Sequence, residues 1–204
     1  RRRTPSLGPD GKTQVTIIDG KVATVLVSTQ HTADISHPEL TDLITKEVVE
    51  PVVGDISGID ILVNPTGQFI VGGFIADTGL TGRKIVVDTY GGIIPHGGGC
   101  FSGKDASKVD RSAAYMARYV AKSLIAKGYG EQCLVSVAYA IGKAEPLMVE
   151  AVNEKGESLS DVVRKNFDFK PLAIIERLGL RRPIFLKTAA YGHFGKDGLP
   201  WEEI

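Results

Sequence analysis

Two glycine-rich loops hold the residues of this chain whose types and spacing could do chemistry. The first carries Asp77, Arg83 and Lys84, and the second runs from Gly97–Gly98–Gly99 to Lys104. Glycine lets a ligand approach the backbone closely and leaves N–H groups bare, while lysine and arginine neutralise negative charge. The two loops together predict a polyanion site, for which the phosphates of a nucleotide are the best fit.

The composition of the chain limits the function further. At 204 residues it can form one large domain or two modest ones with a real core. Its 24 basic and 24 acidic residues balance, so no overall field drives binding to nucleic acid or to a membrane. The sequence has no apolar run of about 18 residues and no signal-peptide pattern. Cys100 and Cys133 lack metal or redox spacing, which favours a reduced, cytoplasmic setting over a disulfide framework.

The first residues allow two interpretations. Arg1–Arg2–Arg3 open the chain without an initiator methionine, and a turn pattern follows at Gly8–Gly11. A basic start could be an arm that binds nucleic acid. We favour the alternative, that the sequence begins at the cut end of a longer protein.

A hairpin and a helix are expected to come first. The β-branched runs Gln14–Ile18 and Lys21–Thr29 flank Asp19–Gly20, which is the strongest short hairpin signal. A helix should then begin at Ser36 or the next residue, with apolar residues along one face, and proline should stop it at Pro51.

The next segment predicts a second hairpin and a domain boundary. Ile59–Val63 and Gln68–Val71 are expected to be its strands, joined by a turn at Asn64–Gly67. Gly72–Gly73 then makes the boundary. Lys84–Thr89 is expected to be a strand between the two glycine-rich loops.

The second half predicts one long helix among shorter elements. Arg111–Lys127 has apolar residues at helical spacing along one face, and a glycine closes it. Further strands and helices are expected at Cys133–Tyr139, Leu147–Val152, Ser160–Phe167 and Pro171–Gly179. The tail, Pro183–Trp201, shows no regular period. Because strands and helices alternate without Rossmann spacing, we expect an α+β fold of two-layer α/β sandwich domains, with mixed or antiparallel sheets and helices on one face.

Seven short strings, in order along the chain, resemble one enzyme family. They are DGKTQVT from Asp10, STQH from Ser28, NPTGQF from Asn64, DTGLTGRKIVVDTYGG from Asp77, HGGGCFSGKDASKVDRSAAY from His96, YAIG from Tyr139 and TAAYGHFG from Thr188. One such string would be weak, but seven in the same order resemble S-adenosylmethionine synthetase (methionine adenosyltransferase) over most of the chain.

The resemblance implies that the chain is roughly the C-terminal half of such an enzyme. Residues 1–72 would be the remnant of a middle domain, and residues 73–204 the C-terminal domain. The family's N-terminal region carries a His/Asp motif that meets ATP and Mg²⁺, and a carboxylate for K⁺. Neither is in this sequence, so we expect the chain alone to be inactive.

The resemblance also implies the reaction. The family transfers the adenosyl group of ATP to the sulfur of methionine, forming S-adenosylmethionine and releasing pyrophosphate and phosphate. Mg²⁺ and K⁺ are its cofactors, and its active sites are shared within a cytoplasmic homodimer that assembles into a tetramer, with no nucleic acid or membrane as partner. A thioether has no proton to lose, so the step needs positioning and charge compensation rather than a general base, which suits a site rich in lysine and arginine.

The phosphate contacts carry over by motif. Arg83 and Lys84 would grip the phosphates, and Lys104 resembles the lysine that the neighbouring subunit contributes. Asp10 and Lys12 match a pair that contacts ATP. The alternatives left open are surface salt bridges for the first two and a solvated turn for the last two.

The contacts to methionine and the nucleoside follow in the same way. Asp77 would face the methionine ammonium and the nucleoside, and Lys108 the methionine carboxylate. Phe69 would stack on adenine, and Ile141 would pack near adenine and methionine. The alternatives are an Asx-turn, a solvent-facing lysine and, for the two apolar side chains, ordinary core positions.

Asp110 has two compatible functions, as a Mg²⁺ ligand and as the cap of the following helix. Two ATP-binding positions depart from the family pattern: Gln68 stands where an arginine is common, and Cys100 where a small residue such as alanine is expected. No metal spacing relates the histidines His31, His37, His96 and His193. We favour a structural function for His96 over phosphate binding, and packing or hydrogen bonding for His193.

A second class of function stays open. The chain could be a catalytically silent nucleotide-binding homologue or a regulatory partner subunit. Such a protein would be expected to have lost some of the charged motif residues, whereas this chain retains Asp77, Arg83, Lys84, Lys104, Lys108 and Asp110. Their retention favours the enzyme.

Overall fold

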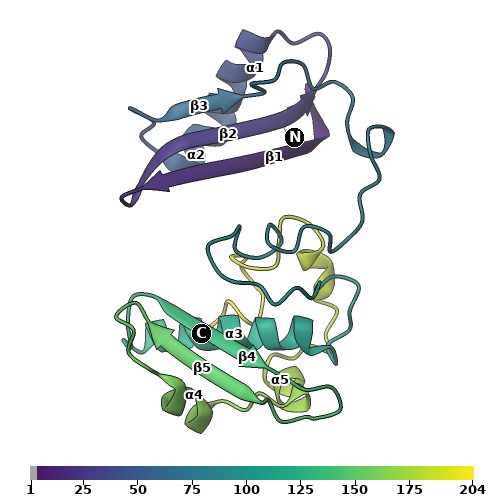
Figure 1. Ribbon diagram of the computed structural model, residues 1–204. Helices are drawn as coiled ribbons and strands as arrows, with labels where there is room; N and C mark the ends of the chain where they lie inside the picture. Colours follow the sequence, from purple (N-terminus) through teal and green to yellow (C-terminus); the bar gives the residue numbers. More distant parts are fainter. Residues whose placement is uncertain (1–3) are drawn as a thin grey trace. The chain divides into compact units, whose positions relative to one another are not determined.

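The computed structural model describes residues 4–204, so the basic start at residues 1–3 lies outside the described residues. The chain divides into two compact units, Arg1–Gly79 and Leu80–Ile204, each of which combines helices with a small sheet (Figure 1). This is the predicted α+β class. No helix of residues 4–204 has both the length and the apolar composition needed to cross a membrane.

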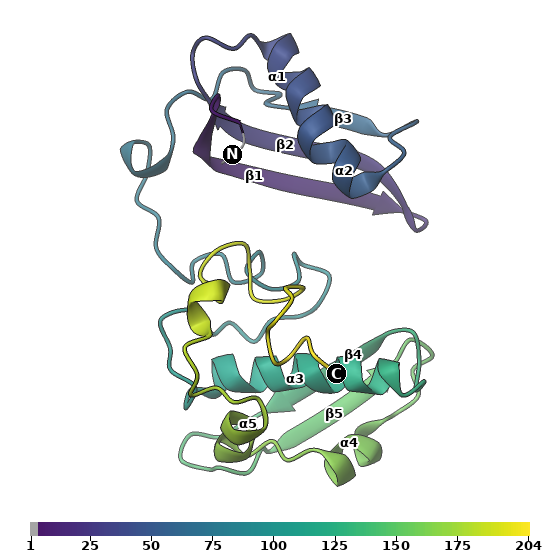
Figure 2. The same ribbon diagram turned by 180° about the vertical axis from the view of Figure 1, so that it is seen from behind.

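The first unit is a three-stranded mixed sheet with helices on one face (Figure 2). β1 (Leu7–Ile18) and β2 (Lys21–His31) form the predicted antiparallel hairpin. Its turn places Asp19 at φ 49° and Gly20 at φ 75°, left-handed conformations that an Asp-Gly turn adopts readily. β3 (Asp60–Val63) pairs in parallel on the other side of β2.

A continuous helical segment covers this sheet and runs through Pro51. Ser36 caps α1 (His37–Ile44) in a capping box, as the start signal predicts. The predicted stop at Pro51 is wrong, because a π-helical turn, η1 (Thr45–Val49), leads into α2 (Glu50–Val53). Proline is tolerated there because it comes just after the π-helical turn and does not stand in the interior of a regular α-helix.

The predicted second hairpin does not form, because a side chain ends the ladder. The N–H of Asn64 donates to the Val27 carbonyl (3.0 Å), continuing the pairing of β3 with β2. Its side chain then takes the place of the next residue: Oδ1 accepts from the Thr29 N–H (2.7 Å), and Nδ2 donates to the Thr29 carbonyl (3.0 Å). The main chain is free to turn, and the segment around Phe69 lies against His31 at the end of β2.

Two further local predictions are wrong. The turn expected at Gly8–Gly11 is part of β1, where the register shifts between Leu7 and Gly11. The strand expected at Lys84–Thr89 is a series of turns, in which the Asp88 N–H donates to the Lys84 carbonyl (2.8 Å). No strand of residues 4–204 pairs with this segment, so local bonds satisfy its backbone despite its β-branched composition.

The second unit is built around α3 (Val109–Ala126). This helix packs on the antiparallel strands β4 (Cys133–Ala138) and β5 (Met148–Asn153). Two shorter helices contact this layer, α4 (Ser160–Asn166) along β5 and α5 (Pro171–Arg177) along α3. The predictions for these five elements are confirmed to within two residues at each end.

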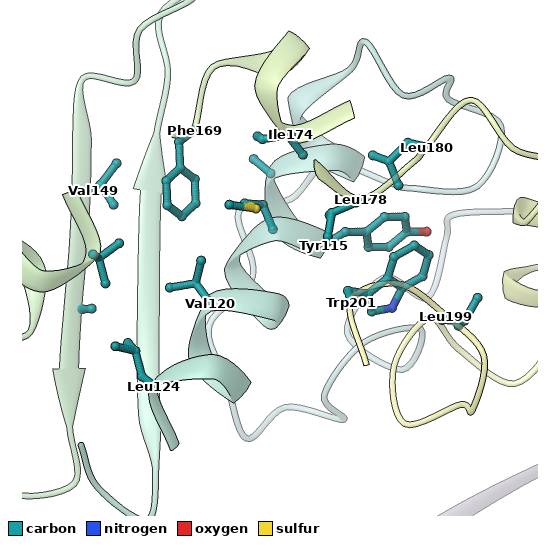
Figure 3. Close-up of a cluster of buried hydrophobic side chains, with 14 of the residues drawn as sticks. Tyr115, Val120, Leu124, Val149, Phe169, Ile174, Leu178, Leu180, Leu199 and Trp201 are labelled. Carbon is teal, nitrogen blue, oxygen red and sulfur yellow. The ribbon is translucent and has the colours of Figure 1, made fainter. Parts of the chain in front are cut away.

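The irregular tail supplies the centre of the core. Trp201 is fully buried and stacks on Tyr115 of α3 with ring centroids 3.7 Å apart. Its indole Nε1 donates to the His193 carbonyl (2.9 Å). Figure 3 shows α3 between two apolar layers, with Val149 and Phe169 on the side of the strands and Trp201 on the other side. The tail is therefore a structural layer, although the only regular element of its described residues is the short 3₁₀ turn η3 (Phe185–Thr188).

Replacing Trp201 with alanine is expected to lower the free energy of unfolding by about 3–5 kcal/mol, because it empties a fully buried site. Urea denaturation followed by circular dichroism measures the loss. The control is Leu186→Ala in the same unit, where the side chain is 86% exposed and a change within about 0.5 kcal/mol is expected. Equal losses in the two variants would contradict the place given to the tail.

Candidate functional site

In the first unit, Asp10 holds the segment that follows β3. Its Oδ2 accepts a hydrogen bond from the Gly73 N–H (2.9 Å). Its own N–H donates to Oε1 of Gln30 (3.3 Å), and Nε2 of Gln30 donates to the Ile70 carbonyl (3.1 Å). A Cβ on Gly72 would fall 2.9 Å from the Gln30 side chain and 3.0 Å from that of Asp10, so the backbone lies directly on both. No local sequence pattern indicates that Gln30 orders Asp10, because the two residues lie 20 positions apart.

Phe69 is held at the end of β2 by His31. The His31 N–H donates to the Phe69 carbonyl (2.9 Å), and the Phe69 N–H donates to Nε2 of the imidazole (3.1 Å). Nδ1 of the same ring donates to the Thr32 carbonyl (2.8 Å), which assigns the neutral Nδ1–H tautomer. The Phe69 ring is half-buried rather than in the core, while Gln68 and Lys12 are exposed.

In the second unit, glycines join the two glycine-rich loops to each other and to α3. At Gly82, where φ is +80°, a Cβ would fall 2.4 Å from the Cβ of Cys100. At Gly99 a Cβ would fall 2.1 Å from a carboxylate oxygen of Asp110. Side chains do not fit at either position, so the first loop packs on the second and the second packs on the start of α3.

Lys104 and Asp110 form an ion pair at this junction. The Lys104 ammonium donates to Oδ2 of Asp110 (2.8 Å), and this hydrogen bond raises the pKa of the lysine. The predicted cap is wrong, because the N-cap of α3 is Lys108, without a side-chain cap bond. Asp110 lies in the first turn instead, where a carboxylate interacts favourably with the helix dipole.

The remaining motif residues are exposed. Arg83, Lys84 and Lys108 are exposed in the second unit, and no ion pair among residues 4–204 involves them. Asp77 is exposed in the first unit. Ile141 is fully exposed, which excludes the alternative that it is an ordinary core residue. The charged groups of Asp77, Arg83, Lys84 and Lys108 thus form no ion pair within residues 4–204.

A buried arginine, Arg111, lies behind the Lys104–Asp110 pair and was not among the residues predicted from the motifs. Arg111 is 4% exposed. Its guanidinium donates to the Lys104 carbonyl (2.6 Å), to Oγ1 of Thr188 (3.0 Å) and to the hydroxyl of Tyr115 (3.1 Å), and it lies 3.7 Å from the ring centroid of Phe185. The available signal was an arginine at the start of α3, the longest helix of residues 4–204, where a buried charge requires several partners.

His193 extends this network to the second glycine-rich loop. Because the Tyr115 hydroxyl accepts from Arg111, its proton goes to Nδ1 of His193 (2.7 Å). The other nitrogen, Nε2, then carries a proton and donates to Oγ of Ser102 (3.3 Å). Burial, with the positive charges of Arg111 and Lys196 nearby, lowers the pKa of His193 to about 4. The predicted packing and hydrogen-bonding function of His193 is confirmed.

His96 orders its own loop. Its Nδ1 accepts from the Gly98 N–H (2.8 Å), and its ring stacks on Phe101. Its Nε2 is buried without a hydrogen-bond partner among the described residues. The ring borders a cavity of about 340 Å³ that also touches Asp110 and Tyr139. Within residues 4–204, no three His, Cys, Asp or Glu side chains gather as a metal site.

The stability of the second unit is expected to fall as the pH drops from about 6.5 to about 4. In this range His193 takes up a proton in the unfolded chain but stays neutral in the folded protein. The free energy of unfolding therefore falls by on the order of 2 kcal/mol. His193→Asn keeps an acceptor near the Tyr115 hydroxyl but does not titrate, and should flatten this part of the profile. Urea denaturation at several pH values measures both proteins. Identical slopes for the two would refute the assignment.

Comparisons with known proteins agree over nearly the whole chain. The model of the S-adenosylmethionine synthetase central domain matches residues 1–69, and that of the C-terminal domain matches residues 71–203. Curated relatives from Pseudothermotoga lettingae, Kosmotoga olearia and Petrotoga mobilis, each named S-adenosylmethionine synthase, are 53% identical to it. The matches cover 98%, 96% and 97% of this chain but 54%, 54% and 53% of the relatives. The chain therefore spans about half the length of the curated relatives it matches.

Proposed function

The chain belongs to the S-adenosylmethionine synthetase family, and on this premise we propose that its full-length protein transfers the adenosyl group of ATP to methionine sulfur. The products are S-adenosylmethionine, pyrophosphate and phosphate. The observation that carries the proposal is the junction of the two glycine-rich loops at α3, where Gly82 meets Cys100 and Gly99 meets Asp110. It fixes the backbone of both loops, and with it the cations that an anionic leaving group requires.

The leaving triphosphate is the centre of the proposed chemistry. A lone pair of methionine sulfur forms a bond to C5′ of ATP while the C5′–O bond breaks, and its electron pair leaves with the triphosphate. Arg83 offers a planar fork and Lys84 a point charge to the phosphate oxygens. Lys104 acts on the same phosphates from the neighbouring subunit. The released triphosphate is then split by water into pyrophosphate and phosphate.

Other exposed motif residues would hold the two substrates. Asp77 faces the methionine ammonium, Lys108 binds the methionine carboxylate, and Ile141 covers both substrates. Phe69 stacks on adenine, a use that suits a ring left half-buried. Contacts to ATP would complete the set, from Asp10, Lys12, Gln68 and Cys100.

A magnesium ion fits Asp110 as a single-carboxylate ligand. Mg²⁺ in phosphate sites usually takes one or two carboxylates together with phosphate oxygens and water. Asp110 supplies one such carboxylate, exposed and beside the glycine-rich loop, although it is paired with Lys104 in this structure. When bound, the ion neutralises charge on the triphosphate. We assign K⁺ to no residue of this chain.

We further propose a cytoplasmic protein that is a homodimer and assembles into a tetramer. The homodimer is needed because shared sites require a second subunit to supply Lys104.

The alternative class, a silent nucleotide-binding partner, would bind ATP without forming product. Turnover by the full-length protein separates the two classes directly.

Replacing Lys104 with alanine in the full-length protein is expected to lower turnover on the order of 10²-fold, because it removes a charge that stabilises the leaving triphosphate. Product formation from ATP and methionine, followed by chromatography, measures the effect. Lys46→Ala is the matched control, since Lys46 also pairs with a carboxylate, Asp42, at 2.9 Å but lies on the helices of the first unit. An active Lys104→Ala enzyme would count heavily against the assignment.

Residues 1–204 expressed alone are expected to form no S-adenosylmethionine, because the nucleotide and metal contacts implied for the family's N-terminal region are not in this sequence. The assay supplies ATP, methionine, Mg²⁺ and K⁺, and detects product by mass spectrometry. Circular dichroism verifies that the expressed chain is folded, and the full-length protein is the positive control. Product above background from the folded chain would overturn this expectation.

A further inference from the structure

Arg111 has an environment that stability alone does not explain. Its guanidinium is buried, yet no ion pair among the described residues includes it. All three of its hydrogen-bond partners, on Lys104, Tyr115 and Thr188, are neutral oxygens. A buried charge without a counter-ion is costly, and apolar residues of similar volume commonly stabilise such a position better.

Arg118, two turns later on α3, shows the ordinary arrangement. Its Nε and NH2 groups donate to the two carboxylate oxygens of Glu202, each at 3.0 Å. It also lies near the rings of Tyr90 and Phe194, but its side chain is more exposed than that of Arg111. The two arginines therefore differ in their partners. Arg118 binds the Glu202 carboxylate of the tail, whereas Arg111 binds the main-chain carbonyl of Lys104, the proposed phosphate-binding lysine.

Two successive residues of α3 hold the two ends of Lys104. Asp110 accepts from its side-chain ammonium at 2.8 Å, and Arg111 donates to its carbonyl at 2.6 Å. Only the first bond has to break when the ammonium turns to a phosphate. The bond to the carbonyl does not involve the ammonium, so it can persist while Lys104 binds an anion.

The other partners of Arg111 fix the guanidinium itself. Thr188, in η3, accepts one N–H and donates its own hydroxyl proton to the Phe185 carbonyl (2.7 Å). The Tyr115 hydroxyl accepts another and passes the chain through His193 to Ser102, two residues before Lys104. The network thus clamps the loop at two points, Ser102 and Lys104.

We propose that Arg111 is the positioning residue of the phosphate site: its buried guanidinium fixes the main chain of Lys104, so that the lysine reaches a triphosphate without an ordering cost. The inference rests on the proposed function of Lys104 and goes beyond it, since the hydrogen bonds of the Arg111 guanidinium within residues 4–204 go to oxygens of the protein itself. Its ligand class is the anionic tail shared by ATP and inorganic triphosphate.

The test is a double-mutant cycle on triphosphate affinity in the full-length protein. Arg111→Lys keeps the charge but loses the planar fork that reaches three oxygens, and Lys104→Ala removes the phosphate contact. The probe is imidotriphosphate with Mg²⁺, whose P–N–P bridge resists hydrolysis, and titration calorimetry measures its Kd. Each single variant is expected to bind roughly ten-fold more weakly. The double variant should bind within about two-fold of Lys104→Ala alone, because Arg111 acts through Lys104.

The other outcomes are decisive in separate ways. Unchanged affinity in Arg111→Lys, or additive losses in the double variant, would overturn the inference while leaving the function of Lys104 intact. If Lys104→Ala bound imidotriphosphate with unchanged affinity, that result would instead contradict the proposed function. Arg118→Lys is the matched control on the same helix and should bind the probe as the unmodified protein does.

A second variant keeps the inference testable if Arg111→Lys does not fold. Thr188→Val removes the acceptor of one guanidinium N–H at nearly constant volume, and thermal melting verifies its fold. We expect a loss of about three-fold in imidotriphosphate affinity that disappears in the Lys104→Ala background. Affinity equal to that of the unmodified protein in a folded Thr188→Val would contradict the positioning function.

Discussion

At the start of α3, Asp110 lies so close to the backbone of Gly99 that a Cβ on residue 99 would fall 2.1 Å from its carboxylate. This contact sets the distance between the second glycine-rich loop and the helix, and Gly82 on Cys100 sets the distance between the two loops. Both contacts depend on the absence of a side chain. The charged residues of the second unit are thus placed by positions that carry no chemistry themselves.

The helix that anchors this junction is in turn held by an irregular segment. Tyr115 stacks on Trp201, and its hydroxyl lies between Arg111 and His193, so one aromatic residue joins the apolar core to the polar network behind Lys104. Glu202, next to Trp201, binds Arg118 on the same helix. The tail therefore stabilises the site although it forms almost no regular structure.

In the first unit, side chains similarly replace main-chain partners. The Asn64 side chain completes the ladder beside Thr29. The Gln30 side chain accepts from the Asp10 N–H and donates to the Ile70 carbonyl, and the His31 ring accepts from the Phe69 N–H. These residues explain why the second hairpin fails to form, since the chain after β3 finds its bonds along β2. Gln30 and His31 thereby order Asp10 and Phe69, two of the proposed ATP contacts.

The sequence by itself determined the elements whose signal is local. The Asp19–Gly20 hairpin, the capped start of α1 and the apolar periodicity of α3 all appear in the structure, because turn chemistry and helical spacing need no distant partner. The charged motif residues and the family could also be identified from the sequence, because short strings in a fixed order can be recognised without knowing the structure.

Only the tertiary structure decided the rest. Lys84–Thr89 is not a strand because no strand of residues 4–204 pairs with it, and Pro51 is tolerated because it follows the π-helical turn. The partners of Arg111 lie as far along the chain as Thr188, so no local pattern could reveal them.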